Sequence, residues 1–371
     1  MFLQKLHLVN FKNYTDAALL FDEGVNCFVG DNGSGKTNLL DAIHYLALCK
    51  SAFNPIDSQN VKHEQDIFVL QGHFSEGDHI DTVYCGFKRN EKKQFKLNQK
   101  EYPRLADHIG RFPVVLISPE DSILITGGSE ERRKLFDSII AQFDSTYLDN
   151  LINYNKVLLQ RNTLLKQFAS SGRFDKQMLD VWDEQLVQLG RLIFERRASF
   201  VEGFVPIFKK YFEYLSEGRE EAGVDYQSSL NEHDFATLLS QAIDKDRFLQ
   251  YTTVGIHKDD LVFKLDGFAV KKFGSQGQQK SFLTALKLAQ FEYIKTVKKS
   301  NPLLLLDDVF DKLDERRLSR LMELVSGAAF GQIFLTDSHP DRAVAIFRKI
   351  KVKPKVFFVQ NGEVSETNKS R

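Results

Sequence analysis

The alternation of apolar and polar side chains defines the first elements of this chain. Residues 1–30 alternate apolar and polar positions, with a break at residues 13–16, and this predicts two strands. Val25–Val29 is a mostly apolar run that predicts a buried strand. Residues 38–48 change to helical spacing, with apolar side chains at Leu39, Leu40, Ile43, Leu46 and Ala47. The chain therefore opens as strand, loop and helix, which is typical of an α/β fold.

Short strand-like runs continue from the first helix to residue 117. Turn residues such as Ser75–Asp78 and Asn98–Lys100 separate them, so they predict a β-meander appended to the first domain. The runs are Ile67–Phe74, Thr82–Phe87, Gln94–Leu97 and Val114–Ile117.

Helical spacing dominates from residue 130 to about residue 216. One apolar stripe there predicts core packing along a helix, and Pro206 is expected to kink it. The stripe consists of Trp182, Leu186, Leu189, Ile193, Phe200, Phe204 and Phe208. Beyond it, the pattern predicts strands at 223–226, 303–306 and 332–336, two strands within 254–273, a closing hairpin at 356–364, and helices at 234–246, 276–298 and 316–326.

Composition narrows the function classes that remain. Of 371 residues, 50 are Lys or Arg and 50 are Asp or Glu, so the formal net charge is zero. A globally basic nucleic-acid binder is therefore not indicated, and any DNA contact is expected from local clusters. Candidate clusters, each equally compatible with a solvated face, are Lys88, Arg89, Lys92, Lys93, Lys96 and Lys100, and Arg132-Arg133-Lys134.

Cysteine usage and hydropathy predict the compartment. The three cysteines, Cys27, Cys49 and Cys85, are widely spaced, form no metal-binding pattern and favour a reducing environment. No apolar run is long enough to span a membrane, and the strand pattern at the N-terminus does not resemble a signal peptide. We therefore expect a cytoplasmic protein without a membrane partner.

A phosphate-binding loop connects the predicted strand to the first helix. The stretch fits the pattern G-x-x-x-x-G-K-[ST], in which backbone N–H groups and the helix N-terminus face the phosphates. We expect Lys36 to reach the β- and γ-phosphates and the Thr37 hydroxyl to hold Mg²⁺. The predicted nucleotide-binding residues are Gly30, Asp31, Asn32, Gly33, Ser34, Gly35, Lys36 and Thr37.

Two carboxylates follow a second apolar run. Leu303–Leu306 is a predicted buried strand, and Asp307 and Asp308 come directly after it. In a P-loop protein this is the Walker B pattern, which predicts that Asp307 lies beside the Mg²⁺ held by Thr37. Asp308 then takes the general-base position toward the attacking water, so Asp308 and Lys36 are the predicted catalytic residues.

A second anion-binding loop precedes Walker B. Gly274–Lys280 places small residues at the start of the helix 276–298, where N–H groups face outward. This order resembles ABC-type ATPases, in which the signature loop of one subunit covers the γ-phosphate held by the other. Compared with the usual Leu-Ser-Gly-Gly-Gln, Gly274 and Gln276 differ, whereas Ser275, Gly277 and Gln278 remain.

The complete set of motifs resembles the RecF family of bacterial recombination-mediator ATPases, in collinear order over residues 1 to about 340. The matching stretches are Asn10-Phe11-Lys12-Asn13-Tyr14, Gly30–Leu40, Ser118-Pro119-Glu120-Asp121, Glu131-Arg132-Arg133, Phe136-Asp137, Tyr154-Asn155-Lys156, Gln160-Arg161-Asn162, Gly255–Asp260, Ser275–Gln279 and Leu306–Asp314.

The resemblance implies a fold and a mode of action. The fold class is α/β, an ABC-type P-loop ATPase head with a mixed sheet, appended antiparallel strands and a mainly helical second lobe without a long coiled coil. We expect residues 1–117 and 296–371 to form the ATP-binding lobe, and residues 118–295 to form the helical lobe that carries the signature motif at 273–280. By the same resemblance, Lys12 contacts phosphate or base and Asp314 lies at a dimer seam.

The resemblance also implies partners. It predicts an ATP-dependent homodimer on single- and double-stranded DNA, including gapped junctions, and a weak DNA-stimulated ATPase activity that serves as a switch. It further implies work with RecO and RecR in loading RecA at gaps, within DNA replication, repair and the SOS response. Substitution of a His-Arg pair by His257-Lys258 weakens the expected phosphate contacts there.

Some assignments stay open in the sequence. Asp337 and His339 both qualify as the switch residue after the next strand, and Glu120 lies nearest to the place of the usual Q-loop glutamine. A transporter ATPase subunit and an SMC-like structural ATPase of chromosomes share the ATP motifs. About 240 residues separate Thr37 from Ser275, which is long for a transporter head, and residues 130–216 are short for an SMC coiled coil. A small-molecule P-loop kinase lacks the signature loop.

Overall fold

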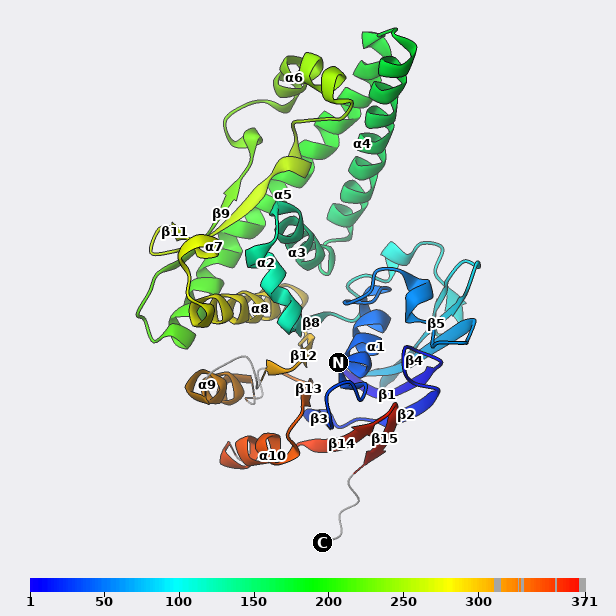
Figure 1. The fold of residues 1–371 in the computed structure, drawn as a ribbon, viewed down its shortest axis with the longest axis vertical. Coiled ribbons are helices and arrows are strands. Elements are labelled where there is room, and N and C mark those ends of the chain that lie inside the picture. The colour runs from blue at the N-terminus through cyan, green and yellow to red at the C-terminus, as the bar shows by residue number, and fades with distance from the viewer. Residues whose placement is uncertain (310–314, 326, 328–329, 351, 367–371) are drawn as a thin grey trace. The chain divides into compact units, whose positions relative to one another are not determined.

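The structure, a computed structural model, describes residues 1–309, 315–325, 327, 330–350 and 352–366 (Figure 1). The chain divides into two compact units, each built from separate segments of the sequence. The first unit comprises Met1–Asp121, Tyr214–Glu217 and Gln276–Arg371, and the second comprises Ser122–Glu213 and Gly218–Ser275.

Helix α8 (Gln276–Lys298) belongs to the first unit, although the sequence placed residues 118–295 together in the helical lobe. The helix packs on strand β8 (Val114–Ile117). Its buried Lys287 also pairs with Asp121 of the first unit, with 2.7 Å between Nζ and Oδ1. Helical periodicity showed that the helix exists, but its packing partner decides the unit to which it belongs.

A mainly parallel sheet forms the core of the first unit. Its order is β15-β14-β3-β13-β12-β8, with only β15 antiparallel to its neighbour. All residues of β3, β12 and β13 are buried, as expected for parallel strands covered on both faces. The bounds are β3 (Val25–Val29), β12 (Leu303–Leu306), β13 (Ile333–Asp337), β14 (Lys355–Gln360) and β15 (Glu363–Glu366).

Strand β8 corrects the predicted meander. The sequence grouped Val114–Ile117 with the antiparallel strands before it, but β8 pairs in parallel with β12, Ile117 opposite Leu306. Its four apolar residues suit a sheet that is covered on both faces, and they do not alternate as the meander strands do.

A second, antiparallel sheet has the order β2-β1-β4-β5-β6-β7 and contains the other predicted meander strands. Helix α1 (Lys36–Leu48) packs on β4 and β5 of this sheet and on β8 and β13 of the parallel sheet. It therefore lies between the two sheets, with ten of its 13 residues buried. The strands are β1 (Phe2–Val9), β2 (Asp16–Leu20), β4 (Ile67–Glu76), β5 (His79–Lys88), β6 (Gln94–Leu97) and β7 (Lys100–Glu101).

Two further helices connect the last strands of the first unit. Helix α9 (Glu315–Val325) precedes β13, and α10 (Pro340–Lys349), which the sequence pattern did not predict, follows it. The two helices pack on each other, and α9 buries an apolar stripe of Leu318, Leu321, Met322 and Val325. The predicted D-loop residues 310–314, including Asp314, lie outside the described residues.

Helices dominate the second unit, with a small sheet in the order β11-β10-β9. Helix α5 runs from Lys176 to Ser216 as one continuous element that includes Pro206. Of the predicted stripe, five side chains are buried, whereas Trp182 and Leu189 are half-buried. The other elements are α2 (Ile123–Thr126), α3 (Ser129–Ala141), α4 (Ser145–Ser171), β9 (Ala222–Gln227), α6 (Phe235–Leu249), β10 (Asp260–Leu265), β11 (Phe268–Ala269) and α7 (Val270–Phe273).

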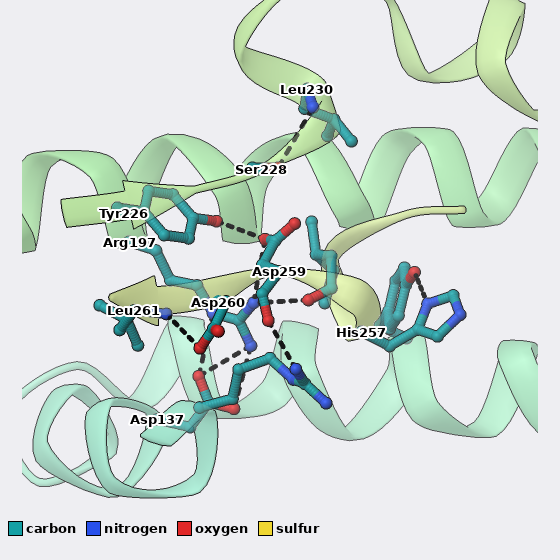
Figure 2. Close-up of polar contacts among 12 residues, drawn as sticks. Asp137, Arg197, Tyr226, Ser228, Leu230, His257, Asp259, Asp260 and Leu261 are labelled. Atoms are coloured by element: carbon teal, nitrogen blue, oxygen red, sulfur yellow. Dashed lines mark hydrogen bonds and ion pairs between the residues drawn. The ribbon is translucent and has the colours of Figure 1, made fainter. Parts of the chain in front are cut away.

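A buried ion-pair network joins helices and sheet within the second unit (Figure 2). Arg197 of α5 is only 3% exposed and makes hydrogen bonds of 3.0 Å to both carboxylate oxygens of Asp137 on α3. It also lies 3.4 Å from Asp259, which accepts a hydrogen bond from Tyr226 of β9. One arginine thus connects α3, α5, β9 and the loop before β10.

Cys27, Cys49 and Cys85 are buried free thiols. Among the described helices, none combines the length and apolarity needed to cross a bilayer. The described residues also contain no group of three or more His, Cys, Asp or Glu arranged to hold a metal ion.

We predict that Arg197→Ala destabilises the second unit by about 3–5 kcal/mol, because it leaves the carboxylates of Asp137 and Asp259 without their cation. Urea unfolding followed by circular dichroism measures the loss. Arg191→Ala on the same helix is the control, since Arg191 is solvent-exposed and pairs only with Glu195 among the described contacts. An equal effect of both substitutions would contradict the central role of Arg197.

Candidate functional site

Four parallel strands end at the same edge of the core sheet, and this edge carries the predicted chemistry. The register aligns Val29 with Asp337, and Leu306 with both Leu335 and Ile117. The segments that follow these ends are the phosphate-binding loop, Asp307-Asp308 and the Ser118-Pro119 turn. Ligands of parallel α/β sheets bind at this carboxyl edge.

The glycines of the phosphate-binding loop are required by its shape. Gly30, Gly33 and Gly35 have φ values of 154°, 79° and 118°, in the region that favours glycine. A Cβ on Gly30 would also lie 2.1 Å from the carbonyl oxygen of Val359. Helix α1 starts directly after Gly35 with no side-chain cap and no acidic residue in its first turn. Its first N–H groups therefore point to a site suited to an anion.

Lys36 and Ser34 indicate what this loop binds. Nζ of Lys36 donates to the carbonyl oxygens of Gly30 (2.8 Å) and Asp31 (2.9 Å), so its charge lies inside the loop. Oγ of Ser34 is buried, and the described residues offer it no hydrogen-bond partner. The loop thus combines the Lys36 ammonium, the Ser34 hydroxyl and the N–H groups at the start of α1. This set of donors is suited to bind a chain of phosphates.

Thr37 and Asp307 come together from positions 270 residues apart, as predicted. Oγ1 of Thr37 donates to Oδ1 of Asp307 at 2.9 Å, and Thr336 of β13 donates to the same oxygen at 2.9 Å. Burial raises the pKa of Asp307 to about 6, even though both hydroxyl donors favour its charged form. Hard oxygen donors around a buried carboxylate fit Mg²⁺, so Thr37 and Asp307 suit this ion.

Asp308 faces the same site in an uncommon backbone conformation. Its φ is 47°, and its N–H donates to Oγ1 of Thr336 at 2.9 Å, which fixes the turn after β12. A non-glycine residue at positive φ stores strain that local contacts must maintain. Asp308 lines a pocket of about 400 Å³ together with Asn32, Gly33, Gly35, Lys36, Thr37, Asn38 and Pro119. Thr336 has no motif of its own, and the sequence did not single it out.

A set of hydrogen bonds, called the brace below, supports the backbone of the phosphate-binding loop. Nδ2 of Asn13 donates to the carbonyl oxygen of Ser34 (2.9 Å), and Oδ1 of Asn13 accepts from Asn38 (2.7 Å). The hydroxyl of Tyr14 donates to the carbonyl of Gly35 at 3.0 Å, and N–H of Gly362 donates to the carbonyl of Ser34 at 3.1 Å. The turn between β1 and β2 and the turn between β14 and β15 thus fix the loop together.

Lys12, predicted from the family motif to contact the nucleotide, makes an internal ion pair. Its Nζ lies 2.6 Å from Oδ2 of the fully buried Asp41 on α1. Asp41 also accepts hydrogen bonds from Ser51 (2.6 Å) and from N–H of Ala52 (2.7 Å). In the described structure, the neighbours Asn13 and Tyr14 touch the loop, whereas the charge of Lys12 is directed at α1.

The two switch candidates differ in their surroundings. Asp337 is buried and pairs with Arg342, whose Nη2 lies 2.5 Å from Oδ1, whereas His339 is exposed at the start of α10. Glu120 is also exposed, and its neighbour Pro119 lines the pocket. The roles of these residues stay predictions.

The signature residues are not among those that line this pocket. Ser275 is exposed, and α8 begins at Gln276, so Gly277 and Gln278 belong to its first turn. Of the described residues that line the pocket, none comes from this stretch. The lining of the pocket thus includes the phosphate-binding loop and Asp308, but no residue of Gly274–Lys280.

Several cations of the proposed DNA clusters are engaged by other groups of the chain. Arg132 makes two hydrogen bonds to Asp260 (2.8 and 3.0 Å), and Arg133 donates to the carbonyl of Asp259 (2.5 Å). Lys93 is 11% exposed and pairs with Asp57 at 2.9 Å. His257, hydrogen-bonded to Tyr154 and to the carbonyl of Thr252, has its pKa lowered to about 4 by burial. The sequence shows the charges, but not the carboxylates that lie beside Arg132 and Lys93 in the folded chain.

The parallel sheet with a phosphate-binding loop and Asp307 at one edge defines a P-loop ATPase head of the SMC type. The model of the RecF/RecN/SMC N terminal domain matches residues 2–365 of the chain. The resemblance of the motifs is confirmed at the level of the whole chain: this protein belongs to the RecF family. The predicted α/β ABC-type fold is confirmed as well.

Relatives match over nearly full length. "DNA replication and repair protein RecF" of Flavobacterium johnsoniae is 50% identical over 357 residues, which cover 96% of this chain and 99% of that protein. The protein of the same name from Phocaeicola vulgatus is 47% identical over 368 residues, covering 99% and 98%. A solved structure, "Structure of the recombination mediator protein RecF-ATP in RecFOR pathway", has a TM-score of 0.90 at 28% identity and covers 99% of this chain and 98% of that one.

We predict that Lys93→Glu unfolds part of the first unit instead of acting on a DNA surface. It removes the partner of Asp57 and places a second carboxylate beside it, which costs about 3–5 kcal/mol. Thermal unfolding and DNA affinity are to be measured together. The exposed neighbour Lys92 gives the control, because Lys92→Glu should leave the unfolding midpoint unchanged. A stable Lys93→Glu protein with weakened DNA binding would contradict this prediction and indicate that Lys93 contacts DNA.

Proposed function

We propose that this protein is a DNA-repair ATPase that closes into a dimer when ATP is bound and opens after hydrolysis. The family and the relatives named as DNA replication and repair proteins support the repair role. The observation that carries the proposal is the division of the site: Thr37 and Asp308 line the pocket, whereas Gly277 of the same unit does not. A second copy of the chain can supply that missing signature.

Each part of the pocket has a role in this proposal. The loop N–H groups, Ser34 and Lys36 bind the phosphates of ATP, and Thr37 and Asp307 hold Mg²⁺. Bound Mg²⁺ would neutralise charge on the β- and γ-phosphates. Asp308 lines the pocket and accepts a proton from the attacking water. The water oxygen bonds to the γ-phosphorus, the bond to the β–γ bridging oxygen breaks, and ADP and inorganic phosphate leave.

Binding energy in this scheme comes from the shared γ-phosphate. Ser275, Gly277 and Gln278 of one copy close over the phosphate that the other copy holds, so neither copy completes a site alone. Hydrolysis removes the group that both copies contact, and the dimer then opens. ATP thereby controls how long the protein stays closed, which suits a switch with weak, DNA-stimulated turnover.

The proposed partners follow from the family and from charge. With zero net charge, the chain is expected to hold single- and double-stranded DNA through backbone contacts that salt weakens. The solved relative described as a recombination mediator in the RecFOR pathway supports work with RecR and RecO, upstream of RecA. A cytoplasmic location accompanies this role. The transporter and SMC structural alternatives are disfavoured because RecF relatives match over the full chain.

The test of this function uses Asp308→Asn, which keeps the pocket but removes the base. We expect this variant to bind ATP, to hydrolyse it at least about 100-fold more slowly, and to accumulate as a dimer. Light scattering with ATP, with ADP and without nucleotide measures the oligomeric state. Titrations with gapped, duplex and single-stranded DNA measure the DNA affinity in parallel. Lys36→Ala is the control that prevents ATP binding. If the Asp308→Asn protein stayed monomeric in saturating ATP, the dimer mechanism would be contradicted.

We also predict that the brace sets nucleotide affinity. Asn13→Ala removes the hydrogen bonds to Ser34 and Asn38, so the loop loses its fixed shape before ATP arrives. Loss of about 1–2 kcal/mol raises the Kd for ATP roughly 5- to 30-fold. Calorimetric titration with ATP measures the Kd, and Asn10→Ala is the control, because Asn10 is half-buried and its side chain bonds to Gln65 outside the loop. Equal ATP affinity in both variants would show that the brace is dispensable.

A further inference from the structure

A pocket in the second unit lies between the C-terminal ends of α4 and α6. The two helices pack on each other within this unit (Figure 1). The pocket has a volume of about 370 Å³, at the lower end of the range for small-molecule sites, so it has room for one planar group but not for a helix. Three aromatic side chains and two arginines lie among its lining residues, namely Phe168, Phe174, Phe248, Arg173 and Arg247.

The aromatic wall of the pocket holds one of these arginines in place. Cζ of Arg247 lies 4.1 Å from the centroid of the Phe174 ring, a cation–π contact, and Phe174 packs edge-on against Phe168. A ring face engages the guanidinium without using its N–H groups. The ion pair of Arg247 with Asp244 is long, at 3.5 Å, and the carboxylate is exposed to water, so this pair contributes little. Arg247 is thus fixed in position with N–H donors available to an anion.

Phe248 lines the same pocket but keeps most of its ring in water. It is 85% exposed, more than any other large apolar residue that the structure describes. An isolated exposed apolar residue is ordinary in a folded protein. Phe248 differs because it stands at the edge of a concave site with aromatic walls. Its ring therefore offers a face on which a planar group held by the pocket can stack.

Exposed charges around the pocket are mainly positive. The two segments that form and flank it, residues 165–176 and 244–248, carry five exposed cations and two exposed carboxylates, although the net charge of the chain is zero. A local excess of cations favours an anionic ligand. The cations are Lys166, Arg173, Lys176, Lys245 and Arg247, and the carboxylates are Asp175 and Asp244. None of these residues belongs to the basic clusters that the sequence brought forward.

A planar ring next to negative charge is the chemistry of a nucleotide. Single-stranded nucleic acid presents unpaired bases that stack on aromatic side chains, while lysines and arginines contact its phosphates. A base inside a duplex is already stacked on both faces, so it cannot stack on Phe248. The pocket therefore fits an unpaired strand and not a duplex.

We propose that this pocket binds single-stranded DNA. An unpaired base stacks on Phe248, and Arg173 and Arg247 donate to the phosphates beside it. The proposal rests on the proposed role in DNA repair and deepens it, because it assigns recognition of the unpaired strand to the second unit. The site shares no residue with the ATP pocket, whose lining residues belong to the first unit.

The first test is Phe248→Ala, with affinity measured by fluorescence anisotropy of a labelled oligothymidylate. The Kd for this strand should rise about 5- to 150-fold, the effect of losing one stacked base. The Kd for a duplex of equal length, the basal ATPase rate and the thermal midpoint should stay unchanged, because Phe248 is exposed and outside the ATP pocket. Phe248→Trp, which keeps an aromatic face, should retain the affinity. An unchanged Kd for Phe248→Ala would overturn the proposal.

The matched control is Phe268→Ala. Phe268 is a second exposed phenylalanine of the same unit, on β11, and it does not line this pocket. Its loss should leave the affinity for oligothymidylate unchanged. An equal loss in both variants would show that exposed rings act without a specific site, and would contradict the role of Phe248.

Stacking and phosphate contact have different signatures. Fluorescence of 2-aminopurine within the strand should fall on binding to the wild-type protein and to Phe248→Trp, but not on binding to Phe248→Ala, because stacking quenches it. Arg173→Gln and Arg247→Gln should each reduce the slope of log Kd against log salt by about 0.7, whereas Phe248→Ala should keep the slope. Arg191→Gln is the control, since Arg191 is exposed, pairs with Glu195 and lies outside the pocket. An unchanged slope in both pocket variants would overturn the phosphate contacts.

Gapped DNA separates this proposal from the function on which it rests. We expect Phe248→Ala to lose the tighter binding to gapped than to duplex DNA that the wild-type protein shows. If Phe248→Ala bound gapped DNA as the wild-type protein does, the pocket would not be a DNA site and its aromatic surface would fit a protein partner instead, while the repair function would stand. If the wild-type protein bound no DNA in any nucleotide state, both the proposed function and this site would be overturned.

Discussion

The hydrogen bond between Thr37 and Asp307 depends on nearly everything else in the first unit. The two residues are 270 positions apart, and they meet at 2.9 Å because β3, β13 and β12 are parallel and end in register. Thr336, on the strand between them, donates to the same carboxylate. The register of the sheet therefore sets the distance between Thr37 and Asp307. A shift of one residue along any of these strands would separate the two side chains.

Burial of this contact also defines its chemistry. Asp307 lies under the sheet edge with its pKa raised to about 6, so the folded protein keeps a carboxylate whose charge is only partly compensated. Lys36 is folded onto the carbonyls of Gly30 and Asp31 at the same time. A phosphate chain with its cation can satisfy all of these groups together. The cation of Lys36 and the carboxylate of Asp307 are thus arranged for one ligand that carries both charges.

Sequence patterns predicted most of the core and the pocket, because both depend on local signals. The buried strands, the loop glycines and the carboxylates of Walker B are short, contiguous and chemically constrained. What the sequence missed depends on contacts between distant segments. Asn13 and Tyr14 were known only as parts of a motif, and their function as a brace emerges when the loop lies beside them. Likewise, nothing local distinguishes the paired Lys93 from the exposed Lys92, and nothing local assigns β8 to the parallel sheet.

Charge pairing within the chain has a consequence for how DNA is held. The net charge is zero, and carboxylates engage Arg132 and Lys93, so the predicted DNA-binding clusters have fewer unpaired cations than their sequence indicates. Weak surfaces gain most from being joined, because the second contact then forms at high effective concentration. In the proposed dimer, ATP would therefore control DNA affinity without touching DNA, by deciding whether two weak surfaces act as one. A strongly basic monomer would lose this control, since it would bind DNA in every nucleotide state.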